Sequence, residues 1–126
     1  MNNLQKALIT NTVFSSISGV VMIIFNKQLA DLFGTNNSTV FWVVGLLLIY
    51  FAMTIAYEIN KQRKLAVLWI IIQDFLWVIG SLILLLLNPY QITLVGNMIV
   101  GIVALIVLFM GIKQTSALNK QIRDEN

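Results

Sequence analysis

Asp74 is the residue whose position in this sequence most directly suggests chemistry. It lies in the stretch IIIQDFLWVIGS, residues 70–81, where it is the only charged side chain among mostly apolar ones. A carboxylate in such surroundings either binds a proton or a cation, or accepts hydrogen bonds that hold the fold together. The sequence alone leaves both interpretations open.

Other kinds of catalytic chemistry lack the residues they need. The chain has no cysteine and no histidine, which excludes thiolate nucleophiles, imidazole bases and Cys/His zinc sites. Of its five carboxylates, only Asp74 lies inside a long apolar segment, so paired acid and base groups are missing. We therefore expect a protein that is not an enzyme and that uses no metal or cofactor.

The composition predicts a membrane protein. The chain has 126 residues, of which 59% are apolar and only 10% charged, and its mean hydropathy is +0.89. Ordinary soluble domains carry about 25% charged residues. Because a chain this short leaves a large surface, it cannot hide so much apolar area from water. The lipid bilayer is therefore the expected surrounding, and nucleic acid is not an expected partner.

Four apolar segments of similar length predict the fold. Residues 7–25, 40–57, 65–87 and 92–112 each fit the roughly 17–25 residues that a membrane-spanning helix needs. Backbone groups in lipid must pair within their own segment, which favours helices. We expect one membrane domain over residues 1–126. Its fold class is an all-α integral membrane four-helix bundle in which short connections make neighbouring helices antiparallel.

The connections between these segments carry further signals. Residues 28–33 place apolar side chains at helical spacing, which predicts a short helix at the membrane interface. A turn-forming cluster follows at residues 34–38. Residues 88–91 predict a tight turn in which Pro89 ends the third span and Tyr90 lies at headgroup level.

The basic residues predict the orientation in the membrane. Four spans would place the two termini and the second connection on the same side. That side carries seven of the eight lysines and arginines, whereas Lys27 alone lies on the other. The positive-inside rule therefore predicts that both termini are cytoplasmic, and the same basic cluster could attract anionic lipid headgroups.

Small and polar side chains recur at helical spacing in each span. In membranes such faces let helices approach closely and form hydrogen bonds with one another. The residues expected to mediate helix packing are Gly19, Gly80, Ser81, Gly101 and Ala104. The residues that could bind a proton or ligand are Asp74, Ser15, Tyr50, Trp77, Ser18, Asn11 and Asn97.

Counting residues from the span ends predicts the partners of Asp74. It lies about 13–14 Å into its helix, close to the middle of a bilayer core about 30 Å thick. Ser15 and Tyr50 are expected at the same level. We therefore expect Asp74 to face the bundle and to accept a hydrogen bond from Ser15 or Tyr50, with Gln73 or Trp77 nearby.

Two functions follow from these observations. In the first, Asp74 organises the polar interior of a non-enzymatic membrane component, which could form homo-oligomers or bind another membrane protein. In the second, the chain is a small proton- or cation-coupled transporter or channel, in which Asp74 binds the ion and Ser15, Ser18, Tyr50 and Asn97 line its route.

Two short motifs resemble those of a known group of proteins. They are Asn11-x-x-Phe14-Ser15-x-x-Ser18-Gly19 in the first span and Asp74-x-x-Trp77-Val78-x-Gly80-Ser81 in the third. In these motifs and in its span layout, the chain resembles a group of small four-span bacterial membrane proteins with no assigned activity. The resemblance implies a protein of the bacterial cytoplasmic (inner) membrane and implies no reaction.

Overall fold

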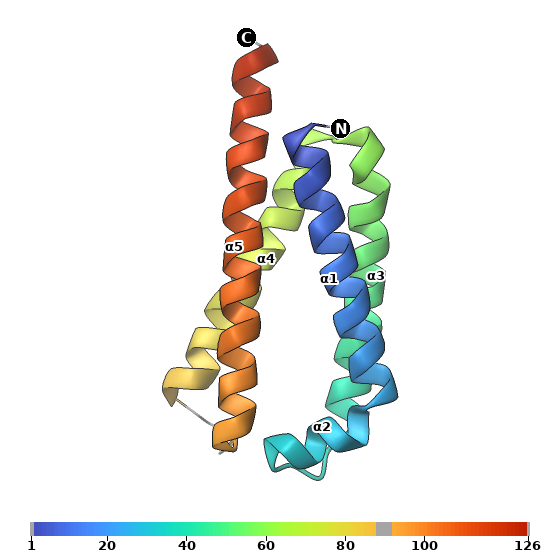
Figure 1. The fold of residues 1–126 in the computed structure, drawn as a ribbon, viewed down its shortest axis with the longest axis vertical. Helices are drawn as coiled ribbons and strands as arrows, with labels where there is room; N and C mark the ends of the chain where they lie inside the picture. Colours follow the sequence, from blue (N-terminus) through green and yellow to red (C-terminus); the bar gives the residue numbers. More distant parts are fainter. Residues whose placement is uncertain (1, 88–91, 126) are drawn as a thin grey trace.

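The structure is all-helical, as the sequence predicts. The computed structural model describes residues 2–87 and 92–125. The helices in this part of the chain are α1 (Asn3–Ile24), α2 (Asn26–Phe33), α3 (Thr39–Lys61), α4 (Lys64–Leu87) and α5 (Leu94–Glu125), shown in Figure 1. The turn predicted at residues 88–91, with Pro89 and Tyr90, lies outside the described residues.

Four of these helices match the predicted spans. By length and composition, α1, α3, α4 and α5 can each cross a membrane. The short helix expected at residues 28–33 is α2, which begins two residues earlier. The largest difference is in α5, because it continues from the end of the predicted span at Ile112 to Glu125.

The long helices are arranged as two pairs. The chain reverses direction from one long helix to the next, and both termini lie at the same end of the molecule, which we call the terminal end (Figure 1). Helix α1 packs along α3, and α4 packs against α5. Contacts between α1 and α5 join the two pairs, and α2 crosses the opposite end, where it contacts α3 and α5.

Local signals in the sequence explain where these helices begin and end. The side chain of Asn2 accepts a hydrogen bond from the Gln5 backbone while the Gln5 side chain accepts one from Asn2, a capping box that begins α1. Gly34 ends α2 in a left-handed conformation with φ of 76°, which glycine adopts without steric cost. Gln62 ends α3 in the same region, with φ of 49°.

A close backbone contact joins α1 to α3. A methyl group added at Gly19 would lie 2.7 Å from the carbonyl oxygen of Gly45, and one added at Gly45 would lie 2.7 Å from that of Gly19. Both glycines are buried. Two glycines facing each other therefore let the backbones of α1 and α3 touch, which is a common way to join membrane helices.

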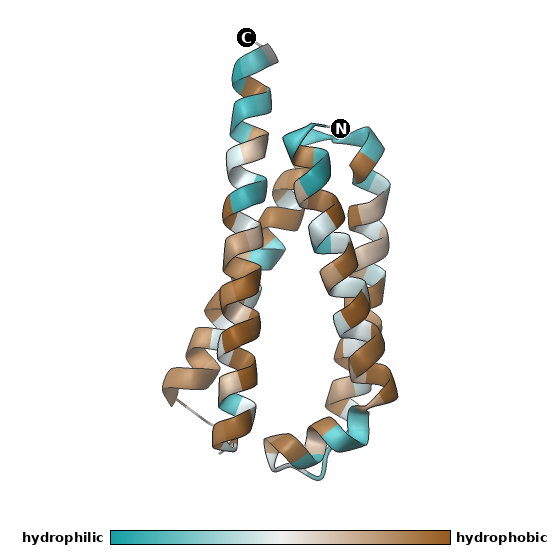
Figure 2. Ribbon diagram, viewed as in Figure 1, coloured by the Kyte–Doolittle hydropathy of each residue, from teal (hydrophilic) through white to brown (hydrophobic). Residues whose placement is uncertain are grey.

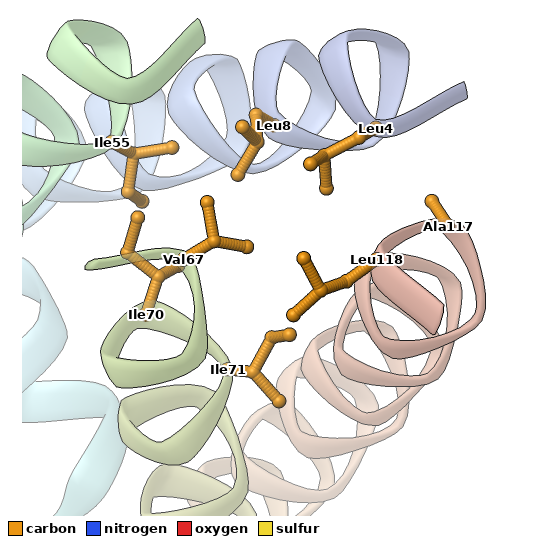
Figure 3. Close-up of a cluster of buried hydrophobic side chains, with 8 residues drawn as sticks. All are labelled: Leu4, Leu8, Ile55, Val67, Ile70, Ile71, Ala117 and Leu118. Carbon is orange, nitrogen blue, oxygen red and sulfur yellow. The ribbon is translucent and has the colours of Figure 1, made fainter. Parts of the chain in front are cut away.

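The largest apolar core lies towards the terminal end. It combines side chains from all four long helices, which point towards one another in Figure 3: Leu4, Leu8, Ile55, Val67, Ile70, Ile71, Ala117 and Leu118. A smaller cluster of Val78, Val107 and Met110 joins α4 to α5 further from that end, and Phe14 of α1 packs against it.

The outer surface of the long helices is apolar. Leucines such as Leu65, Leu86 and Leu94 are more than three-quarters exposed. Figure 2 shows hydrophobic colouring along the middle of these helices, with hydrophilic residues at the terminal end and on part of α2. A surface of this kind suits lipid, so the chain is a multi-pass membrane protein by helix length and hydropathy.

Candidate functional site

Asp74 faces the interior of the helices and lies where α1, α4 and α5 meet. Its side chain is buried, with 4% of its surface exposed. Asn11 of α1 precedes Asp74 in the sequence, and Gln114 of α5 follows it. Both side chains contact Asp74 and are fully buried. Together with Ser15 these residues form the Asp74 cluster: Asn11, Ser15, Asp74 and Gln114.

The cluster is a connected hydrogen-bond network. Asn11 Nδ2 donates to Asp74 Oδ2 at 2.8 Å, and Gln114 Nε2 donates to the same oxygen at 2.6 Å. Asn11 Nδ2 also donates to Gln114 Oε1 at 3.0 Å, which closes a triangle of three side chains. Ser15 Oγ then donates to Asn11 Oδ1 at 2.9 Å and so fixes which side of that amide faces Asp74.

The two carboxylate oxygens of Asp74 differ in their surroundings. Oδ2 accepts both amide donors, whereas Oδ1 accepts no hydrogen bond from any of the described residues. A carboxylate oxygen has lone pairs that can take a proton or bind a cation. The arrangement can therefore hold three helices together through Oδ2 and leaves Oδ1 as the atom available for chemistry.

Helical periodicity explains why these side chains converge. Each of the three helices presents one buried face. On that face, the residue that belongs to the Asp74 cluster lies between residues of the larger and the smaller apolar cores. On α1, Leu4 and Leu8 precede Asn11 by seven and three residues. On α4, Val67 and Ile71 precede Asp74 and Val78 follows it. Spacings of three, four and seven residues return to the same side of a helix, so the faces of the helices align.

The predicted donors to Asp74 need correction. Ser15 belongs to the cluster but donates to Asn11, so it acts on Asp74 only indirectly. The prediction of Tyr50 as a donor is wrong, because 69% of its side chain is exposed on the outer face of α3. Residue counting placed Tyr50 at a suitable depth but gave no information on the direction in which its side chain points.

The other candidate ligand-binding residues do not gather around Asp74. Trp77 is one turn away but 36% exposed, and Gln73 and Ser18 are half-buried. Asn97 lies about 25 Å along α5 from Gln114, at 1.5 Å per residue. There its Nδ2 donates to the Ile92 carbonyl at 3.4 Å, while its buried Oδ1 has no partner among the described residues. Of the four residues predicted to line a route, Ser15 belongs to the cluster, whereas Ser18, Tyr50 and Asn97 lie away from it.

The candidate packing residues also divide into two groups. Gly19 lies at the closest approach of α1 and α3, and Ala104 and Ser81 are buried. A methyl group added at Gly101 would lie 3.8 Å from Leu85 Cδ1, an ordinary packing distance. Gly80 differs from the expectation, because it is exposed and a methyl group there would meet no described atom within 4 Å.

Gln114 was not among the predicted site residues. It lies beyond the predicted fourth span, which ends at Ile112. The missed signal is the continuing helical pattern, in which Met110 precedes Gln114 by four residues and Ala117 and Leu118 follow it by three and four. Gly45, which faces Gly19, was also not predicted, because it is a single glycine in an apolar segment.

A second polar contact joins the end of α3 to the short connection between α3 and α4. Arg63 Nη2 lies 2.6 Å from Glu58 Oε2, and the Arg63 backbone N–H donates to Glu58 Oε1 at 3.1 Å. Glu58 is buried, whereas the Arg63 side chain is 62% exposed. The hydrogen bond to Glu58 raises the pKa of the Arg63 guanidinium, a group that is charged at neutral pH without that partner, and the pair holds the turn.

Comparison with known proteins adds no family to this description. Searches of family models, curated proteins and solved structures found nothing that matches the chain. The resemblance to small four-span bacterial membrane proteins therefore remains a prediction, and the structure establishes a protein of four candidate membrane spans with a buried hydrogen-bonded carboxylate at their junction.

Proposed function

We propose that this chain is a non-enzymatic component of the bacterial cytoplasmic membrane, in which the Asp74 cluster holds the two helix pairs together. The observation that carries the proposal is the convergence of Asn11 from α1 and Gln114 from α5 on one oxygen of Asp74. Hydrogen bonds between membrane helices contribute about 0.6 kcal/mol each on average and up to about 1.7. Three such bonds among α1, α4 and α5 are enough to select one arrangement of the pairs.

A conservative substitution tests this role. Asn at position 74 keeps an oxygen that can accept from Asn11 and Gln114, so Asp74→Asn should retain the fold and its stability within about 1 kcal/mol. The measurement is unfolding of the purified protein in mixed micelles with increasing dodecyl sulfate. Asp31→Asn, at an exposed carboxylate on α2, is the matched control. Loss of folded protein for Asp74→Asn alone would overturn the proposal that hydrogen bonding is the function of this residue.

The proposed orientation has both termini in the cytoplasm. It is supported by the seven-to-one distribution of basic residues and by the common end at which the termini lie (Figure 1). The chain has no cysteine, so single-cysteine variants can be labelled without background. Asn3→Cys and Asn119→Cys should react with a membrane-impermeant maleimide only after cells are opened, whereas Asn37→Cys should react in intact cells. The reverse pattern would overturn this orientation.

The partners of Asp74 also bear on its depth. Asn11 follows Lys6 by five residues, about 7.5 Å along α1, and Gln114 follows Lys113 directly. Lysines near the ends of membrane helices extend towards the interface. We infer that the cluster lies in the cytoplasmic half of the membrane, nearer the surface than the middle position obtained by counting along α4 alone.

A second function is supported by the free oxygen of Asp74. Oδ1 accepts no hydrogen bond from the described residues, and an intramembrane carboxylate with an available oxygen can bind a proton or a small cation. In this proposal the chain is a small proton- or cation-coupled transporter or channel. Asp74 binds the ion through Oδ1, and the amides of Asn11 and Gln114 hold the carboxylate in place.

Flux measurements separate the two functions. Purified protein in liposomes that contain a pH-sensitive dye should show no proton or potassium flux above protein-free liposomes if the cluster only joins helices. The transporter proposal requires a flux in the wild type that Asp74→Asn abolishes and Asp31→Asn leaves intact. A flux that both variants retain would overturn the assignment of Asp74 as the ion-binding group.

A further inference from the structure

A groove between α1 and α5 lies at the terminal end. It has a volume of about 370 Å³ and is lined from both helices, with Lys6 contributed by α1 and Lys113 and Lys120 by α5. All three lysines are exposed. Lys113 and Lys120 are seven residues apart, which places them on one side of α5 about 10.5 Å from each other. We call this feature the lysine groove.

The charge of the lysine groove is unbalanced. None of the residues that line it is acidic. In the part of the chain that the structure describes, the one ion pair joins Glu58 to Arg63, at the connection between α3 and α4. Three ammonium groups around one groove repel one another, so an anion bound between them would relieve that repulsion. The bound group is therefore expected to be negatively charged.

The groove also has an apolar wall. Phe109 and Met110 line it on the side where α5 enters its apolar segment, and 61% of Phe109 is exposed. The ammonium group of Lys113 lies 5.3 Å from the centre of the Phe109 ring, a cation–π distance that holds the charge over the boundary between polar and apolar surface. A soluble anion would leave this apolar wall uncovered, whereas a phospholipid would cover it with an acyl chain.

We propose that the lysine groove binds one anionic glycerophospholipid, with its phosphate among the three lysines and an acyl chain along Phe109. Basic pockets between membrane helices on the cytoplasmic side commonly hold such headgroups. The site lies on the α1–α5 seam, as the Asp74 cluster does, but it uses different residues. Bound lipid would therefore join α1 and α5 a second time, whichever function Asp74 has.

Lipid retention measured by native mass spectrometry tests the site. The intact protein in detergent is titrated with phosphatidylglycerol and, separately, with phosphatidylcholine of the same acyl chains. The wild type should retain the anionic lipid preferentially. Lys113→Gln/Lys120→Gln should lower its affinity about 25-fold, because each of the two lysines near an anionic headgroup contributes about a fivefold factor. Lys27→Gln/Lys61→Gln removes the same charge outside the groove and should leave affinity unchanged.

Two further measurements separate a defined site from general attraction to charge. Ala7 lines the groove, so Ala7→Phe should fill it and lower retention while all three lysines remain. Soluble glycerol 3-phosphate in excess should compete poorly, because it lacks the acyl chain. Equal loss in both double-lysine variants, full retention by Ala7→Phe, or complete displacement by glycerol 3-phosphate would each overturn the proposal. Circular dichroism of each variant verifies that the helices are intact.

Discussion

The two seams that join α1 to the rest of the molecule are built in opposite ways. Against α3, α1 presents Gly19 to Gly45, and the backbones themselves touch. Against α4 and α5, α1 presents Asn11, whose amide reaches a carboxylate and a second amide. The first seam depends on the absence of side chains, and the second depends on side chains whose polar groups pair with one another.

This difference shows which substitutions each seam tolerates. Close backbone contact is lost when any atom is added, because a rigid carbonyl oxygen cannot move aside. A buried hydrogen-bond network tolerates changes of shape better than the loss of one partner, because a remaining polar group is left unpaired. The two seams should therefore respond to different substitutions, and four predictions test this contrast.

The largest effect is expected where Asp74 loses both donors. In Asn11→Leu/Gln114→Leu the carboxylate remains buried without either amide, and each lost donor should lower the free energy of unfolding by about 1–3 kcal/mol. Unfolding in mixed micelles measures the change. Adding Asp74→Leu should restore much of the stability, because the unpaired group is then removed. A triple variant no more stable than the double would contradict the polar nature of this seam.

The next largest effect is expected from one methyl group at the other seam. Gly19→Ala places a Cβ 2.7 Å from the Gly45 carbonyl oxygen and 2.8 Å from Ile49 Cγ1. The helices must separate, which should lower the free energy of unfolding by about 1–3 kcal/mol. The same unfolding titration in mixed micelles measures the loss. An unchanged unfolding curve would contradict close backbone contact.

A smaller effect is expected at the connection between α3 and α4. Glu58→Gln keeps the shape of the side chain but removes the ion pair with the largely exposed Arg63. Exposed and partly exposed pairs contribute about 0.2–1 kcal/mol, so the loss should fall in that range. The measurement is the same unfolding titration at low and high salt, and the difference from wild type should shrink as salt screens the pair.

The smallest effect is expected from Gly80→Ala, the matched control for Gly19→Ala. No described atom lies within 4 Å of the added methyl group, and alanine favours a helix over glycine by up to about 1 kcal/mol. The variant should therefore unfold at the same dodecyl sulfate concentration as the wild type or at a slightly higher one. A loss comparable with that of Gly19→Ala would show that Gly80 contacts another molecule, such as a second copy of the chain, since none of the described residues lies close enough to oppose the added methyl group.

The helices were predictable because lipid restricts what a chain can do. An apolar segment of about 20 residues can pair its backbone groups in lipid by forming a helix. All four long helices and α2 were therefore expected near their observed positions. The burial of Asp74 was predictable for the same reason, because a carboxylate turned towards hydrocarbon is costly. These conclusions need only the polarity of single residues and their order.

The partners of Asp74 were harder to predict because they depend on rotation and tilt. Tyr50 has a suitable depth, yet the buried face of α3 is formed by Gly45, Ala52, Ile55 and Glu58, and Tyr50 lies on the other side. Helix α4 crosses the view of Figure 1 obliquely, so residues counted along it advance less along the long axis of the molecule than the same number of residues on an upright helix. Neither the rotation of α3 nor the tilt of α4 can be obtained from where an apolar segment starts and stops.

The order of synthesis gives the Asp74 cluster a further consequence. Asn11 and Asp74 are 63 residues apart, and Asn11 and Gln114 are 103 apart, so the network closes only after Gln114 has left the ribosome. Until α5 enters the membrane, Asp74 has Asn11 as its one amide donor from this network. The nascent chain therefore carries a carboxylate with fewer donors than the folded protein gives it.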